Sequence, residues 1–306
     1  MTPYTKPSTS IEEQITLLTT RKLVIDDIPK AKYYLNHIGY YRLTGYWLHY
    51  QEDKVNHIFC DNTKFEQIIE LYNFDRKLRL ILFDAIERIE VSFRSVLINE
   101  MCQAYGASWY ANRNLSFNDK NYEENLGVVM QEFGHAKEDF IGHHERNYGS
   151  EEVPPAWKAM QVVSFGTLSK IYSNIDNNVP ERKRIANIFG FKGGAEWIES
   201  FLQVVAVLRN YCAHHSRLCY RRFTSTPKTM GRPAYPWIQP LAAPGGLLSK
   251  QLYYQICVVR YLLFTAYPET DFNEMLRKIV GRFSGVKISQ MGFPDEWEKE
   301  PLWACK

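Results

Sequence analysis

Residues 64–104, KFEQIIELYNFDRKLRLILFDAIERIEVSFRSVLINEMCQA, contain neither glycine nor proline. Thr63 followed three residues later by Glu66 is a pattern typical of a helix start. At 1.5 Å per residue, a helix of this length would span about 60 Å, more than the width of a small domain. Apolar side chains recur along it at helical spacing: Ile68, Leu71, Tyr72, Leu78, Leu82, Ile86, Ile89, Phe93, Val96 and Leu97. The stretch predicts an all-α protein in which one long helix, straight or bent, positions whatever packs on it.

Shorter helices are predicted on both sides of this stretch. Ser10 and Glu13 form a capping-box pattern before a helix that reaches Arg21, and Pro29 lies in the first turn of a helix over 27–37. Further helical segments are predicted over 123–145, 164–175, 181–188, 194–214, 247–265, 271–283 and, as a short docked helix, 294–303.

Three other segments carry weaker or different signals. Residues 39–51, GYYRLTGYWLHYQ, are rich in aromatics and ambiguous between helix and strand. Pro154 and Pro155 predict a turn. Residues 224–246 contain five prolines and predict an irregular loop.

Composition places the chain among globular proteins that need no metal or disulfide to stabilise a core. Of its 306 residues, 45% are hydrophobic and 23% are charged. The six cysteines form no C-x-x-C pair, which favours a reduced, cytoplasmic setting. The first residues, MTPYTKPSTS, lack the apolar run of a signal peptide, and no segment approaches the roughly 20 apolar residues of a membrane span. We therefore expect a cytoplasmic protein that does not contact membrane.

A second informative stretch is RNYCAHHSR at 209–217, which ends the helix predicted over 194–214. Residues four and seven apart share a helix face, so Asn210, His214 and Arg217 are expected to line up, with Arg209 one position round. An imidazole can transfer a proton near neutral pH, and a guanidinium can bind a phosphate. These are the groups needed to cleave a phosphodiester without a metal. A network of interhelical salt bridges with hydrogen-bonded histidines is the structural alternative, and spacing alone does not decide between them.

Acidic side chains on the long helix offer a partner for Arg209. Glu87, Glu90 and Arg94 are predicted to share one face, opposite the apolar face of that helix. Such a row of charges is commonly only a solvated surface. The functional interpretation is that one of these carboxylates pairs with Arg209 and orients it.

The residues from Arg217 onward combine cations with aromatic rings, and many proteins that bind single-stranded RNA use this combination. The cations are Arg217, Arg221, Arg222, Lys228 and Arg232, and the rings are Tyr220, Phe223, Tyr235 and Trp237. The structural alternative is a loop anchored by its aromatic residues. Net charge is only +3, so overall charge does not identify a nucleic-acid partner.

Two other clusters are assigned to structure rather than chemistry. The rings of Tyr40, Tyr41, Tyr46 and Trp47 are expected to pack in the core rather than stack on bases. The cysteines and histidines of 212–219 do not predict a zinc site, because adjacent histidines rarely bind one ion and no second ligand pair follows. We expect no metal and no cofactor.

Four blocks of sequence, occurring in order, carry a family resemblance. They are GYYRLTGYW at 39–47, LYNFDRKLRLILFDAIERIEVSFRS at 71–95, PPAWKAMQVVSFGTLSKIY at 154–172 and LRNYCAHHSRL at 208–218. Together they resemble the Abi-like family, abortive-infection proteins of the AbiD/AbiF kind, over roughly residues 10–265. Arg209 and His214 also fit the R-x4-6-H motif of HEPN-domain ribonucleases, and Asn210 matches the polar residue that commonly follows the arginine.

The resemblance implies a fold, a reaction and a partner. HEPN ribonucleases are helical bundles that dimerise, bring two motifs together across a shared cleft, and cleave RNA without metal. By this resemblance Arg209, Asn210 and His214 are the catalytic residues, with Glu90 and Glu87 supporting Arg209. His215, which also satisfies the motif spacing, is assigned with Arg217, Arg221 and Arg222 to RNA binding, although either histidine could be the catalytic one.

The same resemblance predicts three parts and a biological role. They are an N-terminal helical and aromatic segment over 1–62, a HEPN-type helical domain over 63–268 and a helical tail over 269–306. We expect a homodimeric endoribonuclease in bacterial abortive infection or a toxin–antitoxin system, restrained by a protein or RNA partner. The alternative is an RNA-binding module, or a component of an RNA–protein complex, that cleaves nothing.

Overall fold

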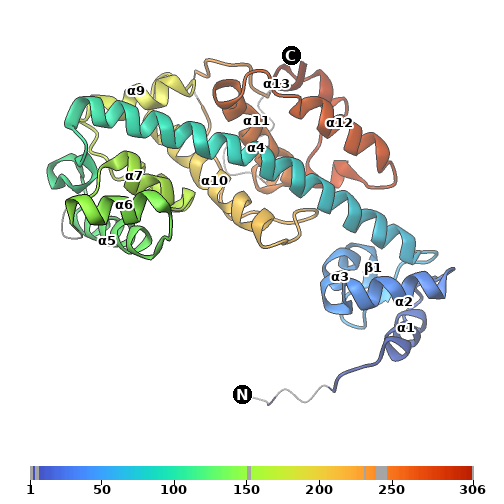
Figure 1. Ribbon diagram of the computed structural model, residues 1–306. Coiled ribbons are helices and arrows are strands. Elements are labelled where there is room, and N and C mark those ends of the chain that lie inside the picture. The colour runs from blue at the N-terminus through green and yellow to red at the C-terminus, as the bar shows by residue number, and fades with distance from the viewer. Residues whose placement is uncertain (1–2, 4–6, 150–152, 231, 239–246, 305–306) are drawn as a thin grey trace.

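The protein is built on one uninterrupted helix that runs through the length of the molecule (Figure 1). The structure, a computed structural model, describes residues 3, 7–149, 153–230, 232–238 and 247–304. Helix α4 spans Phe65–Tyr105, so the predicted long helix is confirmed and neither bends sharply nor breaks. Ile68, Leu82 and Phe93 are among its completely buried side chains.

The start of α4 differs by one residue from the predicted capping pattern. Lys64, not Thr63, is the N-cap residue, and its backbone N–H donates to Gln67 Oε1 at 2.8 Å. The carbonyl of Thr63 instead accepts the N–H of Val24 at 2.9 Å. This backbone contact with the N-terminal segment holds Thr63 outside the helix.

One end of α4 carries an N-terminal lobe (Figure 1). The capping box is present, because Glu13 N–H donates to Ser10 Oγ at 3.2 Å and Ser10 N–H donates to Glu13 Oε2 at 2.7 Å. The ambiguous segment after Gly39 begins as helix and continues into an antiparallel hairpin that was not predicted. The elements of this lobe are α1 Ile11–Thr20, α2 Ile28–His37, α3 Tyr40–Trp47, the 3-10 turn η1 Leu48–Tyr50, β1 Gln51–Asp53 and β2 Ile58–Phe59.

The aromatic cluster of α3 divides between the two sides of the helix. Tyr46 and Trp47 are buried, and Tyr40 packs edge-on against Trp47 with ring centroids 4.9 Å apart. Tyr41 is 90% exposed, so the prediction that it packs in the core was wrong. A helix turns by about 100° per residue, which carries Tyr41 away from the side that Tyr40 shares with Trp47.

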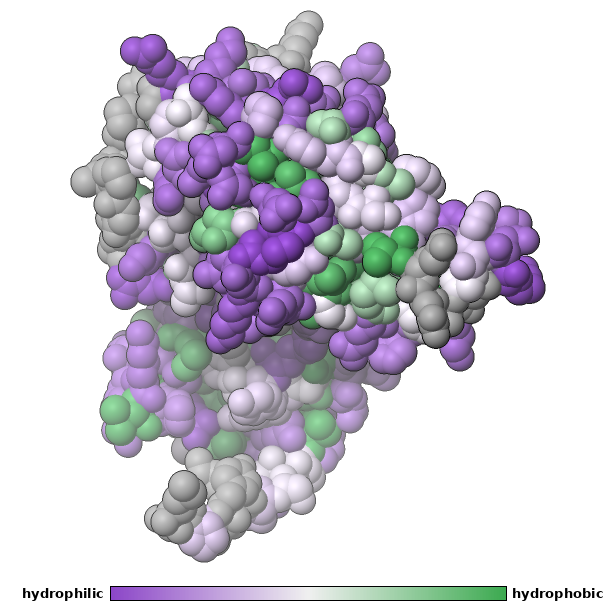
Figure 2. Space-filling model, turned by 90° about the vertical axis from the view of Figure 1, so that its left-hand side faces the viewer, coloured by the Kyte–Doolittle hydropathy of each residue, from purple (hydrophilic) through white to green (hydrophobic). Residues whose placement is uncertain are grey.

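The other end of α4 is covered by short helices (Figure 1). Helix α7 follows Pro154–Pro155 directly and was not predicted. The elements of this end are η2 Trp109–Ala111, η3 Arg113–Leu115, α5 Asp119–His135, α6 Asp139–Tyr148, α7 Ala156–Val162, α8 Phe165–Ser173 and α9 Pro180–Ile188. Figure 2 shows this end as a mainly hydrophilic surface with separate hydrophobic groups.

The middle of α4 packs against α10 Ala195–Ala213, α11 Leu252–Ala266 and α12 Phe272–Arg282. Short turns, η4 Leu247–Lys250, η5 Ile288–Met291 and η6 Trp297–Lys299, link the C-terminal helices, and α13 Pro301–Ala304 ends them. The predicted docked tail is confirmed, because Trp303 is buried and its Nε1 donates to Tyr253 Oη at 2.9 Å.

The all-α prediction is confirmed, and no helix within the described residues is both long and apolar enough to cross a membrane. Residues 231 and 239–246 of the predicted loop lie outside the described residues, whereas 224–230 and 232–238 contain no helix.

A completely buried carboxylate, Asp75, ties α3, α4 and the segment after α10 together. Its Oδ2 accepts the Tyr46 hydroxyl at 2.8 Å and pairs with Arg79, one helical turn further along α4. Its Oδ1 accepts the backbone N–H groups of Leu218 at 2.9 Å and Cys219 at 2.7 Å. Burial raises the pKa of Tyr46, and the charge of Asp75 raises it further, so this hydroxyl stays a donor. Each of these contacts brings a hydrogen-bond donor to the carboxylate. Such partners are required because a buried charge is costly without them.

Replacing Asp75 with alanine should destabilise the protein strongly. The substitution leaves the buried Arg79 without its carboxylate and two backbone N–H groups without an acceptor, and breaking one partner of such a pair costs about 3–5 kcal/mol. The free energy of unfolding from urea titrations followed by circular dichroism measures the loss. Glu274→Ala is the matched control, because it breaks an exposed pair of the same spacing with Lys278 and should cost far less. Equal losses in the two variants would show that Asp75 has no special role.

Candidate functional site

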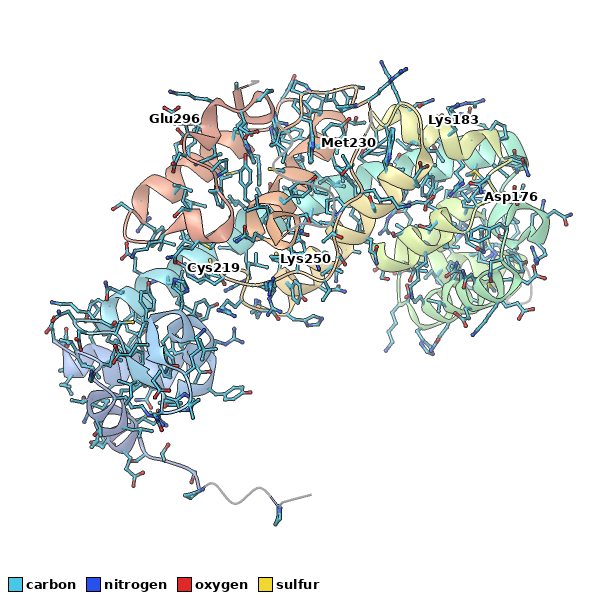
Figure 3. The ribbon with its side chains drawn as sticks, turned by 180° about the vertical axis from the view of Figure 1, so that it is seen from behind. Asp176, Lys183, Cys219, Met230, Lys250 and Glu296 are labelled. Atoms are coloured by element: carbon cyan, nitrogen blue, oxygen red, sulfur yellow. The ribbon has the colours of Figure 1, made fainter. Side chains whose placement is uncertain are left out.

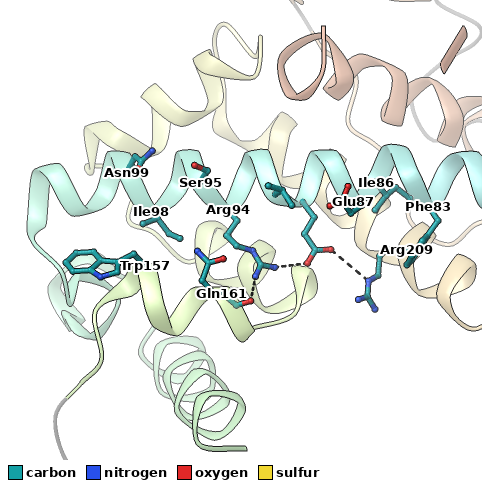
Figure 4. Close-up of a pocket in the computed structure, with 12 residues that line it drawn as sticks. Phe83, Ile86, Glu87, Arg94, Ser95, Ile98, Asn99, Trp157, Gln161 and Arg209 are labelled. Carbon is teal, nitrogen blue, oxygen red and sulfur yellow. Dashed lines mark hydrogen bonds and ion pairs between the residues drawn. The ribbon is translucent and has the colours of Figure 1, made fainter. Parts of the chain in front are cut away.

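Glu90 on α4 forms ion pairs with two arginines, Arg94 and Arg209, which are labelled in the close-up of the site (Figure 4). Its Oε1 is 2.7 Å from Arg94 Nη2, and its Oε2 is 4.0 Å from Arg209 Nε. The Arg94 guanidinium also donates to the carbonyl oxygens of Met160 at 2.8 Å and Gln161 at 2.6 Å. Burial lowers the pKa of Arg94, and the charge of Glu90 opposes this shift. Arg94 therefore serves to hold α7 against α4, while Arg209 keeps a free edge.

Arg209 stands where two surface hollows meet. One hollow, with a volume of about 540 Å³, lies between α4 and α7 and is also lined by Glu87 and Trp157. The other, with a volume of about 710 Å³, is also lined by His135 of α5. Glu90, Arg94, Gln161 and Arg209 line both. The side chain of Arg209 is 37% exposed, so an anion entering either hollow can reach its guanidinium.

Helix α10 ends before it reaches Arg217, although the predicted alignment of Asn210, His214 and Arg217 placed all three on this helix. The last helical residue is Ala213, and His214 is the C-cap. His215 adopts a left-handed conformation with φ of 54°. The N–H of His215 donates to Cys212 O at 3.1 Å, and the N–H of Ser216 donates to Tyr211 O at 2.8 Å. These paired bonds define a Schellman motif, with His215 in the position that glycine usually takes.

This ending separates residues that were predicted to share one face. Asn210 and His214 remain one turn apart and are both exposed. Arg217 lies beyond the helix, so its predicted alignment with them was wrong. The physical reason is the left-handed residue, which turns the chain away from the helix axis.

The turn after α10 is held by contacts with α3 and α4. Arg42 Nη1 donates to His215 O at 2.9 Å, and Arg79 Nη1 is 3.4 Å from Ser216 O. Asp75 then accepts the N–H groups of the next residues. The positions of His214 and His215 therefore depend on the buried Asp75–Arg79 pair.

The basic stretch after the turn is partly built into the protein. Burial lowers the pKa of Arg217, and the neighbouring charge of Arg221 lowers it further. The Arg221 guanidinium lies 4.3 Å from the centroid of the Tyr211 ring, whereas Arg222 is exposed. Both belong to the predicted RNA-binding set, which the contacts neither test nor exclude.

The rings of this stretch are less open than the sequence suggested. Phe223 is buried and Tyr220 stacks on His49. Tyr235 and Trp237 pack against Tyr261, with ring centroids 5.6 Å and 5.4 Å away. These aromatic residues anchor the loop, as the structural alternative had it.

Sequence reasoning missed His135 and Trp157, which line the hollows beside Arg209. Both are far from the motif in the chain, and Trp157 belongs to a helix that was not predicted, so no spacing pattern connected them to it. Within the described residues, no three His, Cys, Asp or Glu side chains are grouped so that they could hold a metal ion.

The fold and the site define a mainly helical protein in which α10 carries an arginine within 4.0 Å of a carboxylate and ends at an exposed histidine. The chain belongs to the Abi-like protein family, whose family model matches residues 33–220. The four sequence blocks that carried the resemblance lie inside this match. The family is associated with abortive infection, so a defence role is the coarse function that membership supports. No curated protein and no solved structure matches the chain.

Replacing His215 with glycine should stabilise the protein. A non-glycine residue in the left-handed region costs roughly 1–2 kcal/mol, and glycine removes most of this strain at the end of a helix. We expect a gain of about 1 kcal/mol in the free energy of unfolding, measured by urea titration. His214→Gly is the control, because the φ of −88° at the neighbouring C-cap requires no glycine. A loss of stability in both variants would mean that the His215 side chain supports the turn.

Proposed function

We propose that the protein is a metal-independent endoribonuclease of the HEPN type that acts in anti-phage defence by abortive infection or as the toxin of a toxin–antitoxin pair. The observation that carries this proposal is the pairing of Arg209 with Glu90 at two open hollows, while His214 stands exposed at the end of the same helix. Membership of the Abi-like family supports the biological setting. A growth-arresting nuclease needs restraint, so the proposal includes a neutralising protein or RNA partner.

The reaction needs a base, an acid and a cation. His214 removes the proton of a ribose 2′-hydroxyl, whose oxygen attacks the adjacent phosphorus. The bond from phosphorus to the 5′-oxygen breaks, and a protonated imidazole supplies the proton for that leaving oxygen. The products are a 2′,3′-cyclic phosphate and a free 5′-hydroxyl. Arg209 stabilises the extra negative charge on the phosphate oxygens in the transition state, and Asn210 orients the imidazole or the phosphate.

Helix geometry supports a dimeric site. Arg209 and His214 are five residues apart, so they differ by roughly 140° around the axis and about 7.5 Å along it. One copy therefore does not aim both groups at a single phosphate. A second copy related by a two-fold axis can set its His214 opposite Arg209, and it also supplies the second imidazole that the acid step needs.

The exposed apolar side of α4 is our proposed dimer face. Leu80 is 54% exposed, Phe83 41% and Val91 56%. Leu80 and Val91 are three turns apart on one side of the helix, and Phe83 lies between them. Phe83 and Val91 also line the hollow that contains Arg209. A partner packed on this face would enclose the hollow and exclude water from the reacting groups.

Introducing a charge into this face should weaken the dimer. Val91→Glu places a carboxylate where apolar contact is proposed, and we expect a shift from dimer to monomer in light scattering at micromolar concentration. Val55→Glu is the matched control, because Val55 is 86% exposed on the β1–β2 hairpin, away from α4. A wild-type protein that is strictly monomeric and yet cleaves RNA would contradict the dimeric site.

The cleavage proposal is tested by incubating the purified protein with RNA in the presence of EDTA. The wild type should cleave, and Arg209→Ala and His214→Ala should each lose at least about 100-fold in rate, because acid–base and charge-stabilising groups contribute that much. Arg184→Ala and His143→Ala are the controls, as they remove exposed side chains of the same types on α9 and α6.

Two outcomes would count against different parts of the proposal. RNA that stays intact with wild-type protein, even after bound RNA has been stripped from it, would favour a module that binds RNA without cleaving it. Cleavage by both site variants at the wild-type rate would leave the activity standing and overturn the residue assignment.

A further inference from the structure

Helix α3 and the η1 turn that follows it lie beside the turn after α10, and the two segments meet at three points. Arg42 Nη1 donates to His215 O at 2.9 Å. A Cβ atom built on Gly45 would lie 3.7 Å from Arg217 Nε. The His49 ring stacks on the Tyr220 ring, with centroids 3.8 Å apart and planes within 7°. Figure 3 shows Cys219 of this turn where the N-terminal lobe meets α4.

Positive charge gathers around these contacts. Burial lowers the pKa of His49, a hydrogen bond with Gln290 opposes this shift, and the charges of Lys287, Lys54 and Arg217 lower the pKa further. Lys54 and Lys287 are exposed. No ion pair among the described residues involves these three cations or Arg42. Lys54, Lys287 and the exposed Arg42 therefore remain available to an anionic ligand, whereas Arg217 is only partly exposed.

Helix α3 also carries an open aromatic ring. Tyr41, next to Arg42 in the first turn of α3, is 90% exposed, the most exposed of the large hydrophobic side chains in the described residues. Of the other rings of α3, Tyr46 and Trp47 are buried and Tyr40 is partly buried against the core. A free aromatic face beside unpaired cations offers stacking for a planar base as well as attraction for phosphates.

We propose that Tyr41, Arg42, His49, Lys54, Arg217 and Lys287 form a binding surface for single-stranded RNA, the α3–turn surface, in which the cations contact phosphates and Tyr41 stacks on a base. This inference deepens the proposed function and rests on it, because the RNA is taken to be the substrate. His214 and His215 are adjacent, so a strand bound at His214 continues directly onto the surface. Duplex RNA would not offer its base faces to Tyr41.

The stacking residue is tested by binding rather than by cleavage. The probe is a fluorescein-labelled 2′-O-methyl oligoribonucleotide of mixed sequence, which has no 2′-hydroxyl to attack, measured by fluorescence anisotropy with the full-length chain. Tyr41→Ala should weaken binding about tenfold, within the range that base stacking on aromatic side chains contributes. Tyr41→Phe should bind like the wild type because it keeps the ring. Tyr33→Ala removes a 58% exposed tyrosine from α2 and should have no effect.

The phosphate contacts are tested by salt dependence. Each phosphate contact with single-stranded nucleic acid contributes about 0.7 to the slope of log affinity against log salt. The double variant Lys54→Gln/Lys287→Gln should therefore lower the magnitude of the slope by roughly 1.4. The double variant Lys30→Gln/Lys120→Gln removes two exposed charges from α2 and α5 and should leave the slope unchanged.

The outcomes separate this inference from the proposed activity. If the wild type cleaves RNA but Tyr41→Ala binds the probe as tightly as Tyr33→Ala, the α3–turn surface is wrong and the ribonuclease stands. If binding depends on Tyr41 while no RNA is ever cleaved, the surface stands and the ribonuclease fails. Failure of the wild type to bind the probe at low salt overturns the surface, as does equally tight binding of an acidic peptide that Tyr41→Ala does not weaken.

Discussion

The structure depends on the buried carboxylate of Asp75, which contacts α3, α4 and the chain after α10 together. A buried charge of this kind is tolerable only while all its partners are in place. The need to keep Tyr46, Arg79 and two backbone N–H groups around Asp75 thus fixes where the chain leaves α10. That exit in turn sets the position of His214, the histidine to which we assign the chemistry.

Helix α4 fixes the distance between Asp75 and Glu90. Asp75 and Glu90 lie 15 residues apart on it, a rise of about 22 Å in a continuous helix. Asp75 accepts hydrogen bonds from the chain after α10. Glu90 lies 4.0 Å from Arg209, which is near the C-terminal end of α10. Helix α10 is therefore held against α4 at both the arginine and the histidine end of the motif. The α3–turn surface is also linked to α4, because Tyr46 of α3 donates a hydrogen bond to Asp75.

Local patterns in the sequence predicted the elements well and their ends less well. Periodic apolar residues and the absence of glycine and proline predicted α4, and the Ser10–Glu13 pair marked α1. The end of α10 was predicted to within one residue, but the turn after it, which takes Arg217 out of line with Asn210, was not. The sequence shows no sign of this turn because its left-handed residue is His215 rather than glycine, and tertiary contacts from Arg42 and Arg79 hold it. Helix α7 and the β1–β2 hairpin are too short for periodicity to reveal them. The contact between Glu90 and Arg209 was inferred from a resemblance, and its catalytic role stays a prediction.

The sequence by itself determined the helical class, the long organising helix and the family, because these follow from short-range periodicity and from blocks of residues that can be compared directly. Only the tertiary structure decided which polar groups meet: Asp75 with the N–H groups of Leu218 and Cys219, Arg42 with His215, and Tyr41 with solvent rather than the core. The physical reason is that helix propensity depends on neighbours within a turn or two. A buried charge instead selects its partners from whatever segments the packing brings together, however far apart they lie in the chain.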